Sequence, residues 1–288
     1  MNTLKLISTG LLLGAISSAV SHADTVYIDH NFDSETIGEA PAYDSLFRTA
    51  LTTIEAGTGA IGTDNAARFN DSSSTLGGIL EYNAGAQALG SLYMQFDLLN
   101  NDPAGASTSG SLFVSVGNWN PSTGNLLNSS TKRSFTIEFS ADTNALRLRG
   151  DNGAIVFSST YTTSALQTVK IFANDNDSAT LDYINPGTGL ISTLNANSVV
   201  VFINDALVAD EEASGFGMSV TGTSGANTTG DATLGRIGFN STSTNLADFL
   251  IDNVYVSSIP SAIPEPSAFA ALLGLGALGF TAARRRRV

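Results

Sequence analysis

The sequence contains no cysteine and only two histidines in 288 residues. The absence of cysteine excludes disulfide bonds, a thiolate zinc site and a cysteine nucleophile. One histidine, His22, lies in a segment that we expect to be removed from the mature protein. A metal centre built from several histidines is therefore excluded as well.

Basic side chains are scarce, and five of the 13 lie near the chain ends: Lys5 and residues 284–287. Residues 24–263 keep 8 basic against 25 acidic side chains, a net charge of −17. Such a body repels polyanions at long range, so nucleic acid is not an expected partner. About 240 residues are enough to bury a core, as one large β domain or two smaller ones.

Residues 1–23 have the pattern of a secretory signal peptide. Lys5 supplies the positive start, residues 11–20 are apolar, and Ser21-His22-Ala23 fits the cleavage pattern of small residues. The alternative is a membrane anchor, but the apolar run is shorter than the ~20 residues of a spanning helix. We expect cleavage between Ala23 and Asp24, followed by export.

The C-terminal segment has three parts in a fixed order. It begins with Pro264, Glu265 and Pro266, and continues with 17 uncharged residues at 267–283 that are rich in Ala, Leu and Gly. It ends with four consecutive arginines: Arg284, Arg285, Arg286 and Arg287. Seventeen helical residues rise roughly 25 Å, near the lower limit for crossing a bilayer. The arginines would remain on the cytoplasmic side.

This ordered arrangement resembles the PEP-CTERM sorting signal of Gram-negative bacteria that make exopolysaccharide. The resemblance implies recognition by a membrane-embedded exosortase that processes the chain near Pro264–Pro266. It also implies transient anchoring in the inner membrane through one short transmembrane helix, followed by release to the cell surface or the extracellular matrix. We therefore divide the chain into a signal peptide at 1–23, a body at 24–258, a linker at 259–263 and a sorting signal at 264–288.

The body shows the alternation of polar and apolar residues that is typical of β-strands. Residues 199–203 form a continuous apolar run, which predicts a strand covered on both faces. Clusters of Asn, Gly, Pro and Ser separate the strands, and the one helical feature expected is a short turn near residues 41–47. Alternating runs occur at 25–32, 92–98, 111–117, 134–140, 166–173, 179–184, 215–221, 233–239 and 248–257.

Twelve to fifteen short strands without an internal repeat predict an all-β fold, a single antiparallel β-sandwich or jelly roll. The opening residues 29–38 (DHNFDSETIG) and the closing residues 249–256 (FLIDNVYV) resemble concanavalin-like, laminin-G-type domains of secreted bacterial proteins. Residues 168–172 and 201–205 resemble central strands of such domains.

Candidate catalytic groups are sparse. A serine triad would have to use His30 of the first strand, and no Gly-x-Ser-x-Gly motif is present. A glycoside hydrolase needs two opposed carboxylates. Glu138 and Asp142 depart from the one-strand pattern of laminarinase-like enzymes, because the second acid falls four residues on, in a turn. Glu211 and Glu212 are adjacent, so on a strand they would point to opposite faces.

Metal and ligand sites are open alternatives. Asp252 falls in phase with Leu250, Val254 and Val256, which would turn a carboxylate toward the core. Structural Ca²⁺, held by Asp252 and by Asp33 near the first strand, would explain it. The alternative is a bulge at which Asp252 accepts hydrogen bonds from backbone amides. Residues 174–178 resemble part of a calcium loop but lack the glycine and the distal glutamate of an EF-hand, so a plain polar hairpin is the favoured interpretation.

Carbohydrate binding rests on fewer residues. Trp119, the single tryptophan, lies at a strand end and would stack on a sugar or pack across a loop. Arg147 and Arg149 share one face of a strand, where they would meet an acidic polysaccharide or form a solvated surface. The sequence thus predicts a non-enzymatic exported protein associated with exopolysaccharide, without a cofactor unless structural Ca²⁺ is bound. The alternatives are a carbohydrate-binding module and, less favoured, a polysaccharide hydrolase or lyase.

Overall fold

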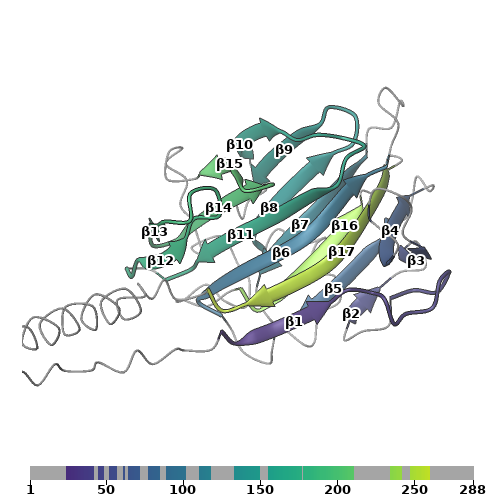
Figure 1. The fold of residues 1–288 in the computed structure, drawn as a ribbon, viewed down its shortest axis with the longest axis horizontal. Helices are drawn as coiled ribbons and strands as arrows, with labels where there is room; N and C mark the ends of the chain where they lie inside the picture. The colour runs from purple at the N-terminus through teal and green to yellow at the C-terminus, as the bar shows by residue number, and fades with distance from the viewer. Residues whose placement is uncertain are drawn as a thin grey trace, which may run out of the picture. The chain divides into compact units, whose positions relative to one another are not determined.

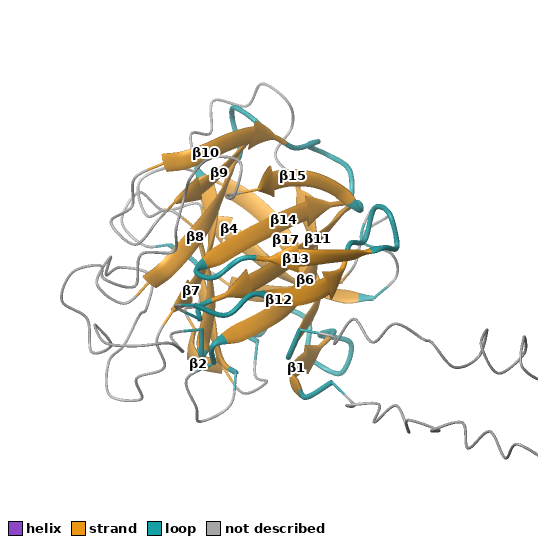
Figure 2. Ribbon diagram, turned by 90° about the vertical axis from the view of Figure 1, so that its left-hand side faces the viewer, coloured by secondary structure: helices purple, strands orange, loops and turns teal. Residues whose placement is uncertain are grey.

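The computed structural model describes residues 24–41, 45–48, 52–56, 61, 64–71, 77–84, 89–101, 110–117, 133–149, 155–176, 178–210, 234–241 and 247–259. Every regular element in these ranges is a β-strand (Figure 2). Residues 45–48 are a strand, so the helical turn expected near residues 41–47 is wrong for its second half. The described strands lie within one compact unit, Asp24–Ala262.

The strands form two large antiparallel sheets and a separate hairpin (Figure 1). The eight-stranded sheet has the spatial order β15 (Ala206–Asp210), β14 (Ser198–Ile203), β11 (Gln167–Asn174), β6 (Ser91–Asn100), β17 (Ala247–Ser257), β4 (Asn65–Asp71) and β3 (Thr52–Ala56), with β1 (Val26–His30) paired to the second half of β17. The seven-stranded sheet has the order β10 (Ile155–Thr160), β9 (Ala145–Arg149), β8 (Arg133–Ser140), β7 (Ser111–Gly117), β16 (Arg236–Ser241), β5 (Ile79–Asn83) and β2 (Ser45–Arg48). The hairpin joins β12 (Leu181–Ile184) to β13 (Ile191–Leu194).

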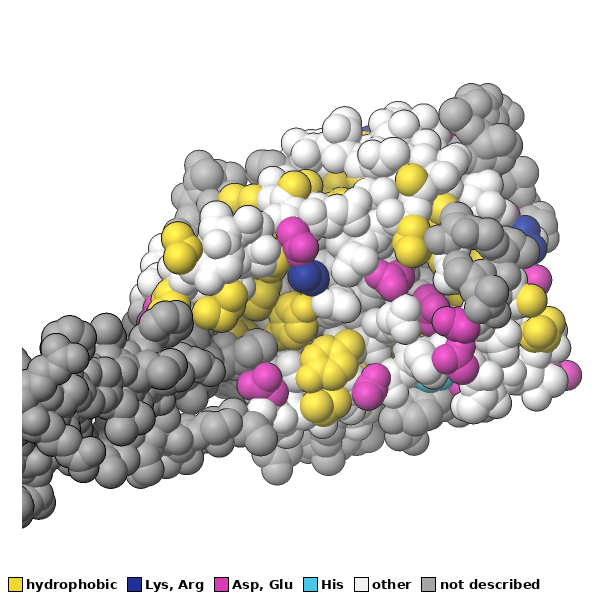
Figure 3. All heavy atoms as spheres, in the orientation of Figure 1, with side chains coloured by type: hydrophobic (Ala, Val, Ile, Leu, Met, Phe, Trp, Pro, Cys, Tyr) yellow, Lys and Arg dark blue, Asp and Glu magenta, His cyan; other side chains and the backbone are white. Residues whose placement is uncertain are grey.

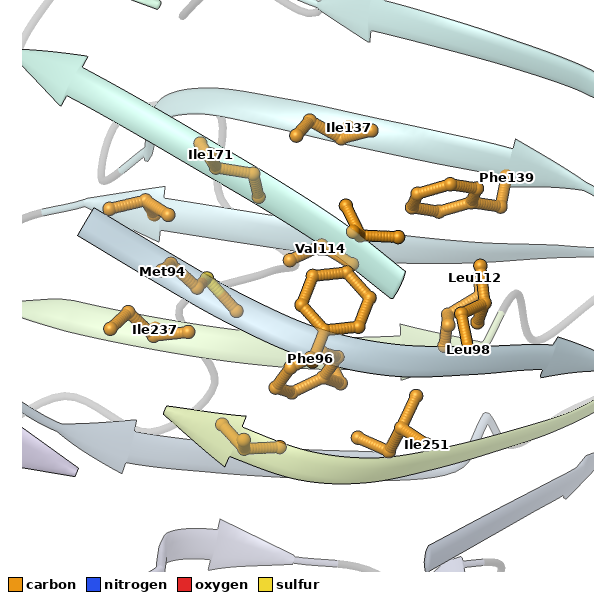
Figure 4. Packing of buried hydrophobic residues seen from close by; sticks show 14 of the residues in the cluster. Met94, Phe96, Leu98, Leu112, Val114, Ile137, Phe139, Ile171, Ile237 and Ile251 are labelled. Atoms are coloured by element: carbon orange, nitrogen blue, oxygen red, sulfur yellow. The ribbon is translucent and has the colours of Figure 1, made fainter. Parts of the chain in front are cut away.

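The two sheets enclose one apolar core, because each strand turns every second side chain inward. Met94 and Phe96 of β6 share this core with Ile137 and Phe139 of β8 (Figure 4). The ring of Phe96 meets those of Phe139 and Phe239 edge to face, with centroids 6.4 and 5.3 Å apart. Aromatic rings prefer this edge-to-face geometry, so the pairs favour one position of the two facing sheets relative to each other. The predicted β-sandwich is therefore confirmed for the described residues.

A second, smaller apolar cluster explains the continuous apolar run at 199–203. Val199 and Val201 face the main core, whereas Val200 and Phe202 face outward. The outward side chains are covered by Tyr183 and Leu194 of the β12–β13 hairpin. All six residues of β14 are buried, as the sequence predicted for a strand covered on both faces.

Both ends of the body lie at one corner of the eight-stranded sheet. The N–H of Thr25 donates to Oγ of Ser258 at 3.0 Å, and the N–H of Ser258 donates to the carbonyl oxygen of Thr25 at 2.9 Å. These bonds extend the antiparallel pairing of β1 with β17. The last of the described strands, β17, lies inside its sheet, between β6 on one side and β4 and β1 on the other.

Candidate functional site

A band of polar side chains crosses the outer face of the seven-stranded sheet. Strand register aligns Glu81, Gly238, Ser115, Thr136 and Arg149 on five successive strands, β5, β16, β7, β8 and β9. The hydroxyl groups of Ser115 and Thr136 are 2.8 Å apart. Most of the band is buried although it lies away from the core. Buried polar groups require hydrogen-bond partners, so the band is a fixed network and not a solvated surface.

Ion pairs lie at both ends of the band. At the β5–β16 end, Glu81 accepts a hydrogen bond from Nη2 of Arg236, and both side chains are buried. At the β8–β9 end, Glu138 accepts from Nη1 of Arg147 at 2.9 Å and from Nε of Arg149 at 2.6 Å. The hydroxyl of Ser111 also donates to Glu138, at 2.9 Å. One buried carboxylate thus orients two arginines on the neighbouring strand.

The two glutamates of the band do not form the carboxylate pair of a glycoside hydrolase. Glu81 and Glu138 are separated by three strand spacings, roughly 14 Å, whereas such pairs lie within about 10 Å. Asp142, the other acid considered from the sequence, follows β8 in a turn and accepts a hydrogen bond from Ser140 at 2.6 Å. Its expected position in a turn is confirmed.

Asp252 lies at an irregularity of β17 and not on the core face. Before it, Phe249 and Ile251 point into the core; after it, Val254 and Val256 do. The register against β6 shifts between Asp252 and Tyr255, so one extra residue reverses the alternation. The prediction that Asp252 turns toward the core is therefore wrong, because it assumed an unbroken period of two. The structure shows the alternative, a bulge at which Asp252 accepts a hydrogen bond from a backbone amide. The N–H of Asn253 donates to Oδ1 of Asp252 at 2.7 Å.

Asp252 belongs to an acidic cluster with Asp33, Asp64 and Asp97. Burial raises the pKa of Asp252 from its ordinary value of 3.8 to about 7; the hydrogen bond from the Asn253 amide opposes the shift, and the charges of the other three carboxylates add to it. β1, which precedes Asp33, pairs with β17, which carries Asp252.

The same cluster is the candidate calcium site, with Asp33 and Asp252 as its proposed ligands. Carboxylate oxygens are the ligands that Ca²⁺ takes. Within the described ranges, however, no three His, Asp or Glu side chains are grouped so as to hold a metal ion. Asp33 Oδ2 accepts a hydrogen bond from Asn31 at 2.6 Å, and Asp97 Oδ1 accepts one from Thr168 at 2.6 Å. The carboxylates of Asp33, Asp97 and Asp252 thus interact electrostatically, and each accepts a hydrogen bond from a neighbouring group. Bound calcium remains a prediction.

His30 forms a buried chain of polar contacts with residues of two other segments. Its Nδ1 lies 2.9 Å from the hydroxyl of Tyr82, and its Nε2 lies 2.8 Å from Oε1 of Glu35. Its ring packs on Phe32 with centroids 3.9 Å apart. This arrangement ties β1 to β5 and to the loop after β1, so the structure supports a structural role for His30.

Several predicted residues lie outside the described part of the chain. They are the signal peptide with Ala23, the ligand candidate Trp119, the acids Glu211 and Glu212, and the sorting signal at 264–288. The structure describes Asp24, on the other side of the expected cleavage point. In the part that the structure describes, no helix is long and apolar enough to span a membrane.

Sequence reasoning missed the two ion-pair groups of the band. Glu81 and Arg236 are 155 positions apart, and no local pattern connects them. Glu138 with Arg147 could have been found, because residues 141–144 between β8 and β9 fix the hairpin register that places the two opposite each other.

Comparison with known proteins identifies the C-terminal segment. Residues 262–287 match the family model described as the PEP-CTERM protein-sorting motif. No curated protein matches the chain. The motif marks an exported protein with a membrane-anchored precursor that an exosortase processes.

Three of the similar solved structures are a carbohydrate esterase, a carbohydrate recognition domain and an alginate lyase. A carbohydrate esterase from the Shiga toxin-encoding bacteriophage phi24B is 11% identical, with a TM-score of 0.45 over 82% of this chain and 100% of that chain. The metal-free carbohydrate recognition domain of Emp46p is 11% identical, with a TM-score of 0.47 over 83% and 97%. The alginate lyase vAL-1 from Chlorella virus is 9% identical, with a TM-score of 0.41 over 72% and 90%. At these identities and scores the similarity assigns this chain neither a substrate nor an activity.

Proposed function

We propose that this protein is a non-enzymatic component of the cell surface or the extracellular matrix and associates there with exopolysaccharide. The observation that carries the proposal is the sorting motif at residues 262–287, which directs an exported precursor to an exosortase. The motif determines where the protein is sent, and the folded body provides the surface that acts at that location. An acidic body without cysteine is suited to remaining soluble outside the inner membrane.

Three of the described titratable groups support a role without catalysis. Glu81 and Glu138 are held in ion pairs at opposite ends of the polar band. His30, the one histidine of the expected mature chain, is engaged with Tyr82 and Glu35 in a buried network. A general acid or base needs a titratable group within reach of a substrate, and these groups are buried and committed to structural contacts.

The second candidate function is a carbohydrate-binding module. The partly exposed end of the band favours it, because the side chains of Arg147 and Arg149 are 27% and 24% exposed and guanidinium groups make directional hydrogen bonds to ligand hydroxyl and carboxylate groups. Trp119 is proposed as a stacking residue for a sugar ring. A hydrolase or a lyase is the least supported alternative.

Two measurements on the purified body separate these functions. A polysaccharide array that includes the producer's own polymer measures binding, with Trp119→Ala as the variant that tests stacking. Incubation with the bound polymers measures newly formed reducing or unsaturated ends. We expect binding to at least one polymer and no new ends. Chain cleavage would replace the proposal by an enzyme, and no binding to any polymer would remove the association with exopolysaccharide.

A further inference from the structure

The outer face of the eight-stranded sheet carries a row of aromatic and polar side chains that crosses four strands. Gln95 of β6 lies opposite Tyr255 of β17 on one side and opposite Lys170 of β11 on the other. Tyr255 in turn lies opposite Asp29 of β1. The neighbours of these residues along β6, β11 and β17 point into the core, so the row itself points outward. All four side chains are at least partly exposed.

A second tyrosine enlarges the aromatic part of this row. Tyr93, two residues before Gln95 on β6, meets Tyr255 at an angle of 61°, with ring centroids 6.2 Å apart. The ring of Tyr93 also packs on Phe172, with centroids 4.9 Å apart, and Tyr183 of the β12–β13 hairpin covers Phe172. Phe172 and Tyr183 are buried, whereas Tyr93 and Tyr255 remain partly exposed. The open aromatic surface beside the hairpin therefore belongs to Tyr93 and Tyr255.

The polar groups of the row have hydrogen-bonding capacity that the described contacts do not use. The hydroxyl of Tyr93 donates to Oε1 of Gln95 at 2.7 Å, which orients the amide. Burial raises the pKa of Tyr93 to about 12, with the charges of Tyr255 and Asp205 adding to the shift, so this hydroxyl stays protonated at neutral pH. Among the described residues, Nε2 of Gln95 and the hydroxyl of Tyr255 have no hydrogen-bond partner. Both groups are available to a ligand.

Acidic side chains surround the row. Asp29 lies at one end, Asp97 follows Gln95 by two residues on β6, and Asp205 accepts a hydrogen bond from Nζ of Lys170 at 2.6 Å. Figure 3 shows this face with hydrophobic side chains, a class that there includes tyrosine, gathered beside a basic one and acidic ones around them. Three carboxylates against one ammonium group give the row a net negative charge, so it repels an anionic ligand.

We infer that this face binds a neutral polysaccharide of β-linked sugar rings with equatorial hydroxyl groups. Such rings present an apolar C–H face to Tyr93 and Tyr255, and hydroxyl groups at the ring edge to Gln95 and Lys170. The row spans three strand spacings from β1 to β11, roughly 14 Å, so it contacts more than one ring of an extended polymer. The inference rests on the proposed association with exopolysaccharide, and it adds the binding face and the charge class of the polymer.

The test uses affinity electrophoresis of the purified exported protein with two soluble polymers that share the cellulose backbone: neutral hydroxyethylcellulose and anionic carboxymethylcellulose. Tyr255→Ala removes one ring of the aromatic pair, and Tyr255→Phe keeps the ring without its hydroxyl. Gln95→Ala removes the free amide. Ile155→Ala is the matched control, because Ile155 of β10 is an apolar side chain, 50% exposed, on the other sheet. Equal melting temperatures show that a variant is folded.

The wild type is expected to be retarded by hydroxyethylcellulose more strongly than by carboxymethylcellulose. Tyr255→Ala should lose about tenfold in affinity for the neutral polymer and Gln95→Ala about threefold, while Tyr255→Phe and Ile155→Ala should stay close to the wild type. No retardation by hydroxyethylcellulose, or equal retardation of the wild type and Tyr255→Ala, overturns this binding face. Equal retardation of the wild type by both polymers overturns the neutral class.

Two further outcomes assign the result. Wild-type dimers in sedimentation that Tyr255→Ala abolishes would give this face to a second copy of the chain and overturn the inference. Binding to another polymer on the polysaccharide array, without retardation by hydroxyethylcellulose, overturns the inference and leaves the proposed function standing. A blank array overturns the proposed function itself.

Discussion

Asp97 and Asp252 stand directly opposite each other on neighbouring strands of the eight-stranded sheet. Like charges in this position destabilise a sheet. The side-chain amide of Asn253 relieves the conflict, because its Nδ2 donates to Oδ2 of Asp97 at 2.9 Å and lies 3.4 Å from Oδ2 of Asp252. Asn253 reaches both because its backbone adopts a left-handed conformation, with φ of 51°. The bulge in β17 thus brings an amide to a pair of carboxylates.

The first prediction concerns pH. The folded state holds the proton of Asp252 more tightly than the unfolded chain, since its pKa is about 7 against an ordinary 3.8. Stability from this group is complete below its ordinary pKa and is lost as pH rises toward 7. Asp252→Asn should remove that loss and stabilise the metal-free protein above pH 7 by on the order of a few kcal/mol. Urea unfolding across this window measures it.

A matched control for the pH experiment is Asp205→Asn. Asp205 is a half-exposed carboxylate that accepts a hydrogen bond from Lys170 at 2.6 Å, and it lies outside the acidic cluster. This variant should follow the pH dependence of the wild type. If Asp252→Asn follows it too, then Asp252 does not carry the raised pKa.

The second prediction concerns calcium. Ca²⁺ should raise the melting temperature of the wild type and a chelator should lower it, because an ion would neutralise the carboxylates of Asp33 and Asp252. Asp252→Ala should respond to neither reagent. Differential scanning calorimetry with and without the ion provides the comparison. Equal responses of the two proteins, or none in either, would remove calcium from consideration.

The third prediction contrasts a buried ion pair with an exposed one. Glu81→Ala leaves Arg236 buried without this carboxylate and should destabilise the protein by about 3–5 kcal/mol. Asp205→Ala breaks the exposed pair with Lys170 and should cost less than about 1 kcal/mol. A second variant, Glu81→Leu with Arg236→Met, should recover most of the loss, since neither charge is then buried. Similar costs for the two single variants would show that burial does not govern these pairs.

The fourth prediction concerns the arginines at 284–287. Their replacement by alanine should disturb membrane anchoring and processing, because positive charge holds the end of an apolar segment on the cytoplasmic side. Replacement by lysine keeps that charge and should preserve anchoring better. Cell fractionation and the mass of the exported protein report both steps. Unchanged fractionation and mass in the alanine variant would contradict a sorting role for this cluster.

Local patterns predicted the strands better than they predicted the side-chain partners. The expected strand at 111–117 is β7, and the apolar run at 199–203 is buried on both faces as expected. These features depend on the alternation within one strand. The orientation of Asp252 was wrong because a bulge inserts a residue that no composition signal marks. The link between Glu81 and Arg236 joins distant parts of the chain, and only the order of strands in the sheet brings them together.

The position of β17 constrains when the body can fold. β17, the last of the described strands to leave the ribosome, is an interior strand of its sheet, hydrogen-bonded to β6 on one side and to β4 and β1 on the other. Until residues 247–257 have been exported, β1 has no partner among the described strands, and β6 and β4 have no described strand between them. Pairings this distant in sequence form slowly. The sandwich therefore closes only after translocation of the body is complete, while the sorting segment that follows still holds the chain at the membrane.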